Sequence, residues 1–368
     1  MSLRDKLALF NVELPLERAK TIPSLWYYDP EIYQAEIKQT FLQNWIWAGR
    51  TGQLPEPGTF FTFDIGPEPI LVAKDKEGAS RAFSNVCRHR AARVMPTACG
   101  RANYFQCRYH GWTYDLSGKL KGVPEFDGVE NFFREENSLP LWKLSQWKDF
   151  LFVNGSQSPA QSLSDFLYPF SDRVGSLALD QMKFVGRKEY ELRCNWKVFV
   201  DNYLDGGYHV NTLHPTLAGV INYAEYRTEI ARQTAVQVSP LRVAAKDPTL
   251  GEVRGGEAAY YWWVYPNLMF NIYEGLMDIN VVLPLGPDRC KVIFDFFFAD
   301  TEGEVAQKRI AKSLAVAHQI QLEDEAICEE VQRNFQSRSF DTGRFSVRRE
   351  SGGHHFHQML ARELMSTF

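Results

Sequence analysis

The sequence predicts an α+β protein with two domains, and three observations support this prediction. The chain has 368 residues, a length more typical of two domains than of one. Between residues 51 and 153, short alternating runs such as TFFTFDI and PILVAKD lie between Gly, Pro and Asp turns, as in an antiparallel β region. The second half mixes amphipathic helical segments with runs rich in β-branched and aromatic residues. We therefore expect an antiparallel β domain followed by a domain of strands and helices.

The elements of the first half follow from periodicity and turn residues. Residues 30–48 are expected to form one helix, because apolar side chains recur on one side of it: Ile32, Ile37, Phe41 and Trp45. The run FLFVNGSQSPAQS ends the β region with a strand and a polar linker. This places the domain boundary near residues 156–161.

In the second half, the segment NWKVFVDNYLDGGYHVNTLHP predicts a helix that breaks at Gly206 and Gly207. Strands are expected at residues 258–275, 278–286 and 289–300. Residues 304–335 predict a long amphipathic helix. The apolar side of this helix comprises Ile310, Leu314, Ala317, Ile320 and Ala326.

Composition and charge exclude several classes of function. The formal net charge of −4 provides no basic surface for nucleic acid or an anionic membrane. No apolar run approaches the roughly eighteen residues that a membrane helix needs, and the first residues lack the apolar stretch of a secretory signal. Six cysteines in a chain of this length do not suggest a disulfide scaffold. We therefore expect a cytoplasmic protein without nucleic-acid or membrane partners.

Two cysteines and two histidines lie at metal-ligand spacing in the β region. Cys87 and His89 form one pair, and Cys107 and His110 form a second pair; 17 residues separate His89 from Cys107. A structural zinc site usually pairs like with like, whereas both pairs here are mixed. A Rieske-type [2Fe–2S] centre needs this stoichiometry, with two cysteines on one iron and two histidines on the other. Cys99, the other cysteine of this region, is expected to be a small buried apolar residue.

A second group of ligands is expected in DNYLDGGYHVNTLH. Asp201, Asp205 and His209 are four residues apart and would share one helical face, and His214 follows after five. Two histidines and one carboxylate form the facial triad of non-haem Fe(II) oxygenases. The carboxylate is expected in QLEDEAICEEVQ, where spacing alone does not choose among Glu323, Asp324, Glu325, Glu329 and Glu330.

The Cys-x-His and Cys-x-x-His pairs, followed by Gly111-Trp112, resemble the Rieske domain of the Rieske non-haem iron oxygenases, the α subunits of aromatic-ring-hydroxylating enzymes. The resemblance extends over roughly residues 25–360. It implies that Cys87 and Cys107 bind the inner iron of a [2Fe–2S] cluster and that His89 and His110 bind the outer one. It also implies a segment 1–45 that packs on the catalytic domain, a Rieske domain 46–157, and a catalytic domain 158–368 with an antiparallel sheet packed against helices.

The same resemblance implies His209 and His214 as ligands of a mononuclear Fe(II). Similarity to ED-x3-C-E-x-VQ, typical of the branch that acts on choline, betaines and carnitine, selects Asp324 as the third ligand. Many relatives place an acidic residue that links the two metal centres three positions before the first histidine, where this chain has Gly206. We expect Asp205 to take that role, with Asp201 as the alternative.

The substrate and the partners are also predicted. Tyr261, Trp263 and Tyr265 would share one strand face and line the iron pocket, where aromatic rings suit a planar ring or a quaternary ammonium group. No dinucleotide-binding fingerprint is present, so electrons are expected from a separate NAD(P)H-dependent reductase, with or without a ferredoxin. The resemblance also implies a homotrimer.

These expectations combine into one hypothesis: a terminal oxygenase that uses O₂ to hydroxylate a C–H bond of a quaternary ammonium compound. Dihydroxylation of an aromatic ring is the alternative within enzymes. A Rieske electron carrier or redox sensor is the alternative from another class, and it would need only the first metal site.

Overall fold

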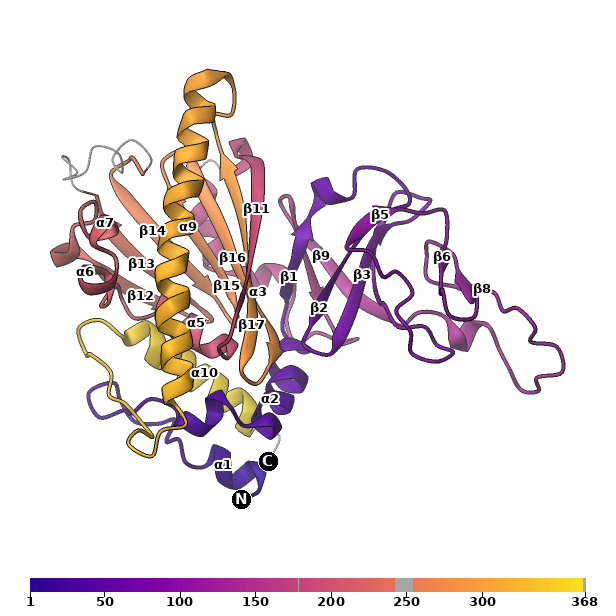
Figure 1. Ribbon diagram of the computed structural model, residues 1–368, viewed down its shortest axis with the longest axis horizontal. Coiled ribbons are helices and arrows are strands. Elements are labelled where there is room, and N and C mark those ends of the chain that lie inside the picture. The colour runs from indigo at the N-terminus through magenta and orange to yellow at the C-terminus, as the bar shows by residue number, and fades with distance from the viewer. Residues whose placement is uncertain (178, 242–253, 367–368) are drawn as a thin grey trace. The chain divides into compact units, whose positions relative to one another are not determined.

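The computed structural model describes residues 1–177, 179–241 and 254–366. The chain forms two compact units: Met1–Thr40 with Ser164–Phe368, and Phe41–Leu163. Both contain antiparallel sheets, and the first also contains the long helices, so the α+β prediction is confirmed (Figure 1).

The unit Phe41–Leu163 is built on a seven-stranded antiparallel sheet. The strands in sheet order are β1 (Ile46–Arg50), β10 (Phe150–Asn154), β9 (Leu141–Trp147), β4 (Ser80–Ser84), β3 (Glu68–Lys74), β2 (Thr59–Ile65) and β5 (Cys99–Arg101). A smaller sheet holds β6 (Phe105–Gln106), β7 (Thr113–Tyr114) and β8 (Leu120–Gly122). The antiparallel β region predicted from the alternating runs is therefore present.

The other unit has its own seven-stranded antiparallel sheet. The strands in order are β11 (Lys183–Leu192), β17 (Arg289–Phe298), β16 (Leu276–Gly286), β15 (Leu268–Tyr273), β14 (Ala258–Val264), β13 (Thr234–Pro240) and β12 (Arg227–Ala231). Its helices are α1 (Leu3–Leu7), α2 (Pro30–Glu36), α4 (Phe170–Arg173), α5 (Trp196–Tyr203), α6 (Val210–Leu213), α7 (Pro215–Ala218), α9 (Gly303–Asn334) and α10 (Ser351–Met365); α3 (Leu163–Leu167) begins at the last residue of the other unit.

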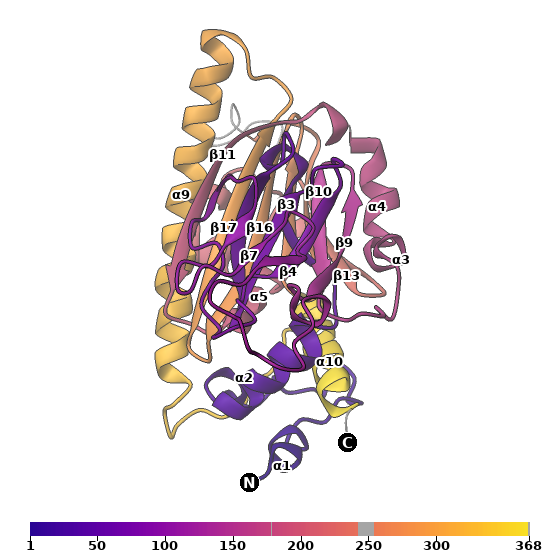
Figure 2. The same cartoon turned by 90° about the vertical axis from the view of Figure 1, so that its right-hand side faces the viewer.

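Helices cover both faces of this second sheet. Phe170 of α4 stacks on Phe270 of β15 on one face. On the other face, Tyr203 of α5 donates a hydrogen bond to Asn271, the next residue of β15. Successive strand residues point to opposite faces, so the two contacts lie on opposite sides of the sheet. Figure 2 shows α9 on one side of the strands and α4 on the other.

Three local expectations are corrected by the structure. The helix predicted at residues 30–48 ends after a π-helical turn at Ile37–Phe41, and Trp47 lies in β1, paired with Phe152. The strand predicted at residues 258–275 is two strands, β14 and β15, separated at Tyr265-Pro266-Asn267. Cys99 is exposed on the edge strand β5, not buried. Within the described residues, no helix is both long and apolar enough to cross a membrane.

Candidate metal centres and substrate cavity

Two loops with the same backbone pattern hold the Cys and His pairs. In the first, the N–H of Cys87 donates to the carbonyl of Ala92, and the N–H of Ala91 donates to the carbonyl of Cys87. The second loop repeats these bonds between Cys107 and Trp112 and between Gly111 and Cys107. The residue four positions after each cysteine has a positive φ, 57° at Ala91 and 73° at Gly111. The two pairs are therefore presented on matched turns.

The side chains of these loops fit a [2Fe–2S] cluster. Cys87 and Cys107 are 3% and 2% exposed, whereas the ring of His110 lies at the surface. The imidazole rings of His89 and His110 are 4.5 Å apart between centroids. The Nδ1 atom of His89 is buried and has no hydrogen-bond partner among the described residues, which is expected of an atom that binds a metal. Buried thiols with histidines outside them match an inner and an outer iron.

The electrostatics of the loops also suit a cluster. Burial raises the pKa of the Cys107 thiol, and the neighbouring Cys87 thiol raises it further. The N–H groups of Tyr109 and His110 donate to the Cys107 sulfur and act in the opposite direction. Burial and the charge of His110 lower the pKa of His89, which favours the neutral imidazole that a metal needs. The ring of Trp112 stacks on His89 at 5.0 Å and helps to fix its orientation.

We expect Cys107→Ser to remove the visible absorbance of the cluster, because a hydroxyl is a poor substitute for an iron-bound thiolate. The mononuclear iron should remain, since its ligands lie in the other unit. Absorbance spectra and iron analysis measure both effects. Cys99→Ser is the matched control, because Cys99 is exposed and is not among the four ligands. Loss of colour in Cys99→Ser, or a coloured Cys107→Ser, would contradict the ligand assignment.

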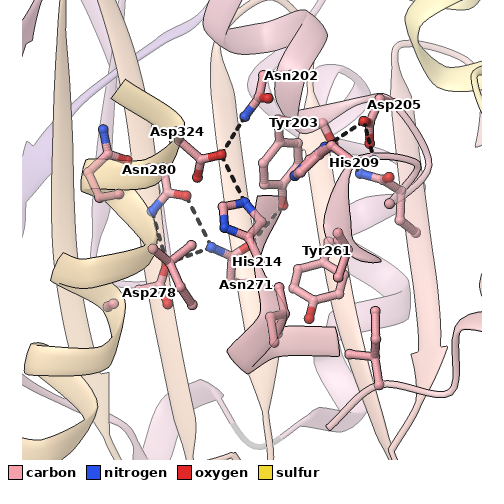
Figure 3. Close-up of a pocket in the computed structure, with 18 of the residues that line it drawn as sticks. Asn202, Tyr203, Asp205, His209, His214, Tyr261, Asn271, Asp278, Asn280 and Asp324 are labelled. Atoms are coloured by element: carbon pink, nitrogen blue, oxygen red, sulfur yellow. Dashed lines mark hydrogen bonds and ion pairs between the residues drawn. The ribbon is translucent and has the colours of Figure 1, made fainter. Parts of the chain in front are cut away.

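A second ligand group lies in the unit Met1–Thr40 with Ser164–Phe368. His209, His214 and Asp324 each offer one ligand atom, and these atoms all lie within 4.8 Å of one another. The two imidazole rings are 5.0 Å apart and nearly perpendicular, at 78°. Figure 3 shows the carboxylate of Asp324, from α9, beside His214. Among the described residues this is the one group of three or more such side chains at metal-binding distance.

Each of the two histidines is fixed by a second carboxylate. The Nδ1 atom of His209 lies 2.5 Å from Asp205 Oδ2, and the Nδ1 atom of His214 lies 2.6 Å from Glu323 Oε2. A proton held at each Nδ1 leaves each Nε2 available to a metal, the usual arrangement of a metal-bound histidine. The Nε2 atom of His214 is 3.1 Å from Asp324 Oδ1. The arrangement therefore fits a mononuclear metal ion held by two imidazoles and one carboxylate.

The charge of this cluster favours a cation. Burial lowers the pKa of His214, but the Asp324 and Glu323 carboxylates outweigh burial and raise it overall. The surroundings thus stabilise positive charge on the ring, and a divalent ion beside its Nε2 receives the same stabilisation. Asn202 donates a hydrogen bond of 2.8 Å to Asp324 Oδ1 and fixes the third ligand.

The break between α5 and α6 places His209 correctly. Gly206 and Gly207 have φ values of +71° and +69°, and a Cβ at Gly206 would lie 2.0 Å from the carbonyl oxygen of Arg349. Only glycine fits this turn without strain. The Asp205 carboxylate accepts from the N–H groups of Tyr208 and His209, which closes the turn.

The shared helical face expected for Asp201, Asp205 and His209 is absent, because α5 ends at Tyr203. Asp201 instead accepts hydrogen bonds from Tyr27, at 2.6 Å, and lies 2.8 Å from His357 Nε2. Asp205 is therefore the one of the two carboxylates that contacts His209.

A cavity extends from the ligand group toward the sheet. Tyrosine rings, polar side chains and three further charged residues, Asp205, Arg254 and Asp278, line it beside His209, His214 and Asp324. The tyrosines are Tyr203, Tyr226, Tyr261 and Tyr273, and the other polar members include Asn271, Asn280, Asp278 and Arg254.

The predicted aromatic wall is corrected at two of its three positions. Tyr261 lines the cavity, whereas Trp263 and Tyr265 do not. Trp263 lies on the same strand face but packs on Phe356 of α10, and the hydroxyl of Tyr265 bonds to Glu363 of the same helix. Helix α10 covers that end of the face, so the cavity is confined to the other end.

Sequence reasoning did not identify the roles of several residues of the site. Glu323 was one of five candidate ligands, and its contact with His214 Nδ1 gives it an orienting role. Asp278 and Asn280 alternate along the apolar strand β16 and are 5% and 2% exposed. Polar residues with period two in an apolar strand are a pattern that could have identified this wall.

Comparison with known proteins agrees with both metal sites. Residues 179–366 match the family model for the ring hydroxylating alpha subunit (catalytic domain), and residues 44–133 match that for the Rieske [2Fe-2S] domain. The chain is 37% identical to the chloroplastic choline monooxygenase of Arabidopsis thaliana, over 96% of this chain and 85% of the relative. It is 27% identical to the carnitine monooxygenase oxygenase subunit of Acinetobacter baumannii, over 91% of both chains.

A solved quaternary ammonium Rieske monooxygenase in complex with L-carnitine has a similar structure, with a TM-score of 0.81 at 26% identity over 95% of this chain and 99% of the other. The fold and the two sites define an iron-dependent oxidoreductase of the Rieske oxygenase class. The chain belongs to the family of ring-hydroxylating alpha subunits, and its cofactors are a [2Fe–2S] cluster and a mononuclear iron.

Proposed function

We propose that this chain is the terminal oxygenase of a multicomponent Rieske system and hydroxylates a C–H bond of a quaternary ammonium compound of the choline, betaine or carnitine type. The observation that carries the proposal is the cavity beside His209, His214 and Asp324, with its tyrosine walls and the buried carboxylate of Asp278. A quaternary ammonium group is attracted to the faces of aromatic rings and to negative charge, and it needs no hydrogen-bond acceptor. The names of the two relatives described above support the same class of substrate.

The residues have distinct roles in this proposal. Cys87, His89, Cys107 and His110 hold the cluster, and His209, His214 and Asp324 hold the mononuclear iron. When bound, the cluster supplies single electrons, and the mononuclear iron supplies open positions for O₂. Asp205 and Glu323 keep the Nδ1 protons of the two iron-binding histidines in place. Tyr203 and Asn202 fix side chains around the cavity, through Asn271 and Asp324 respectively.

Asp205 has a further proposed role as the link between the two metal centres. Its Oδ2 atom already contacts His209 Nδ1, and a carboxylate can accept a second hydrogen bond from a cluster histidine. In the homotrimer that we propose, that cluster belongs to the neighbouring chain. An aspartate between two histidines would then fix both tautomers and provide a short path for electrons.

The partners and the organisation complete the proposal. A separate NAD(P)H-dependent reductase, with or without a ferredoxin, delivers the electrons.

Residues 46–157 form the Rieske domain and residues 158–368 form the catalytic domain, with residues 1–45 packed on the catalytic domain. The compact unit that joins Met1–Thr40 to Ser164–Phe368 supports this division. No disulfide joins any of the six cysteines, as expected in a reducing compartment such as the cytoplasm, which is the location we propose.

We expect quaternary ammonium compounds to stimulate O₂ consumption by the purified protein in the presence of a surrogate reductase, and neutral arenes to have no such effect. Choline, glycine betaine, carnitine and naphthalene form a sufficient panel, with hydroxylated or demethylated products identified by mass spectrometry. Turnover of naphthalene to a diol without any response to the ammonium compounds would replace this proposal with ring dihydroxylation. Reduction and reoxidation of the cluster without oxygenation of any member would favour an electron carrier.

A further inference from the structure

Two side chains of opposite charge line the substrate cavity without forming an ion pair with each other. Arg254 and Asp278 both line it, and no ion pair joins them. Each nevertheless affects the other, because the positive charge of Arg254 opposes the rise that burial causes in the pKa of Asp278. The cavity therefore presents a positive and a negative group to whatever binds in it.

Most N–H donors of the Arg254 guanidinium have no partner among the described residues. Its Nη1 atom donates a hydrogen bond of 2.7 Å to the hydroxyl of Tyr273, and its guanidinium lies 5.0 Å from the centre of the same ring. No carboxylate of residues 1–177, 179–241 or 254–366 lies within ion-pair distance of it. A guanidinium has five N–H donors in a planar fork that matches a carboxylate. Arg254 is partly buried, and partial desolvation of a cation without an anion is unfavourable, so a ligand that brings an anion is favoured.

The carboxylate of Asp278 is placed to bind a cationic group of a ligand. Its side chain is buried, and its Oδ2 atom accepts hydrogen bonds from Asn271, at 2.7 Å, and from Asn280, at 2.9 Å. Its Oδ1 atom has no hydrogen-bond partner in the described part of the chain. Figure 3 shows Asp278 below Asn280, with Asn271 between it and Tyr203. Two amides fix the carboxylate, and one oxygen is left for a ligand.

The tyrosines connect these two groups. The hydroxyls of Tyr261 and Tyr273 are 2.8 Å apart, and the ring of Tyr226 stacks on Tyr261 at 6.2 Å. A trimethylammonium group beside these rings and Asp278 would be stabilised by cation–π and charge attraction. A carboxylate on the same molecule would meet Arg254. Choline has only the cationic group and brings no anion to Arg254.

We propose that the cavity selects zwitterionic quaternary ammonium carboxylates over choline, with Arg254 binding the carboxylate and Asp278 with the tyrosine rings binding the ammonium. This inference rests on the proposed function and narrows its substrate class. It assigns specificity to two residues outside both metal-ligand groups.

The test compares each carboxylate with its carboxamide, which has nearly the same shape but no negative charge. Carnitine and carnitine amide, glycine betaine and its amide, and choline are assayed by O₂ consumption with the holoenzyme, and their dissociation constants are measured by calorimetry without reductase. For the wild type we expect the carboxylates to bind about 10- to 100-fold more tightly than the amides, the effect of a charge-assisted hydrogen bond. Arg254→Gln should abolish this difference by weakening only the carboxylates.

The carboxylate ligand and its carboxamide carry the same ammonium group, so Asp278→Asn tests the ammonium-binding half of the site alone. It should weaken both ligands to a similar extent. Arg227→Gln, at an exposed arginine of β12, is the matched control and should change neither. Iron content and cluster absorbance equal to the wild type show that each variant is folded.

Two outcomes overturn the inference while the proposed function stands: a wild type that binds choline or the amides as tightly as the carboxylates, or an Arg254→Gln variant that weakens carboxylate and amide equally, as a merely structural arginine would. A wild type that oxidises none of these compounds overturns the proposed function and this inference together.

Discussion

His209→Ala is expected to lose the mononuclear iron and substrate-dependent turnover while it keeps the cluster spectrum. The imidazole is one of only three ligand side chains, and its removal leaves His214 and Asp324 to hold the ion. Loss of a residue that merely orients a ligand typically weakens metal binding about 10- to 100-fold, so removal of a ligand should exceed about 100-fold. Metal analysis and O₂ consumption measure the two losses.

The cluster should not respond to this change, because its four ligands lie in a different unit of the chain. His355→Ala is a suitable control, since His355 Nε2 bonds to the carbonyl of Arg232 and lies outside both ligand groups. A His209→Ala protein that retains its mononuclear iron, or one that loses its colour, would contradict the assignment of two separate sites.

Asp205→Asn is expected to bind both cofactors and to be reduced normally, but to transfer electrons to the mononuclear site at least about 100-fold more slowly. Asparagine keeps the size of the side chain, whereas it loses the charge and one of two acceptor oxygens. The one amide oxygen of the asparagine cannot replace both carboxylate oxygens. The variant therefore cannot accept one hydrogen bond from His209 Nδ1 and another from a second histidine. Stopped-flow absorbance of the reduced cluster, mixed with substrate and O₂, measures the rate of reoxidation.

Asp201→Asn is the matched comparison, because Asp201 lies four residues before Asp205 and contacts Tyr27 and His357 instead of a metal-binding histidine. It should reoxidise at nearly the wild-type rate. Reoxidation of Asp205→Asn at the wild-type rate would exclude the linking role, and slow reoxidation of Asp201→Asn alone would move that role to Asp201.

The metal ligands could be predicted because their chemistry constrains spacing along the chain. The mixed Cys and His pairs require each loop to contribute to both irons, and this pattern is visible without a structure. His209 and His214 are close in sequence, and the two glycines between Asp205 and His209 indicated the break that brings them together. Asp324 lies 110 residues after His214 and could be selected only by resemblance.

The cavity was harder to predict because it depends on tertiary contacts. The alternation along β14 correctly placed Tyr261 and Trp263 on one face, but the sequence does not show that α10 covers one end of that face. Arg254, Asn271 and Asp278 line one cavity because β15 and β16 are neighbours in the sheet and Arg254, four residues before β14, lies beside them. Alternation along a strand predicts which side chains share a face, whereas tertiary packing determines which other element covers that face.

The central claim is that one chain carries a cluster for electron transfer and a separate iron for oxygen chemistry. The most direct test is the content of iron and acid-labile sulfide in the purified protein after anaerobic reconstitution with both. This account predicts about three irons and two sulfides per chain, with one iron lost selectively in His209→Ala. Two irons and two sulfides per chain, unchanged in His209→Ala, would contradict it.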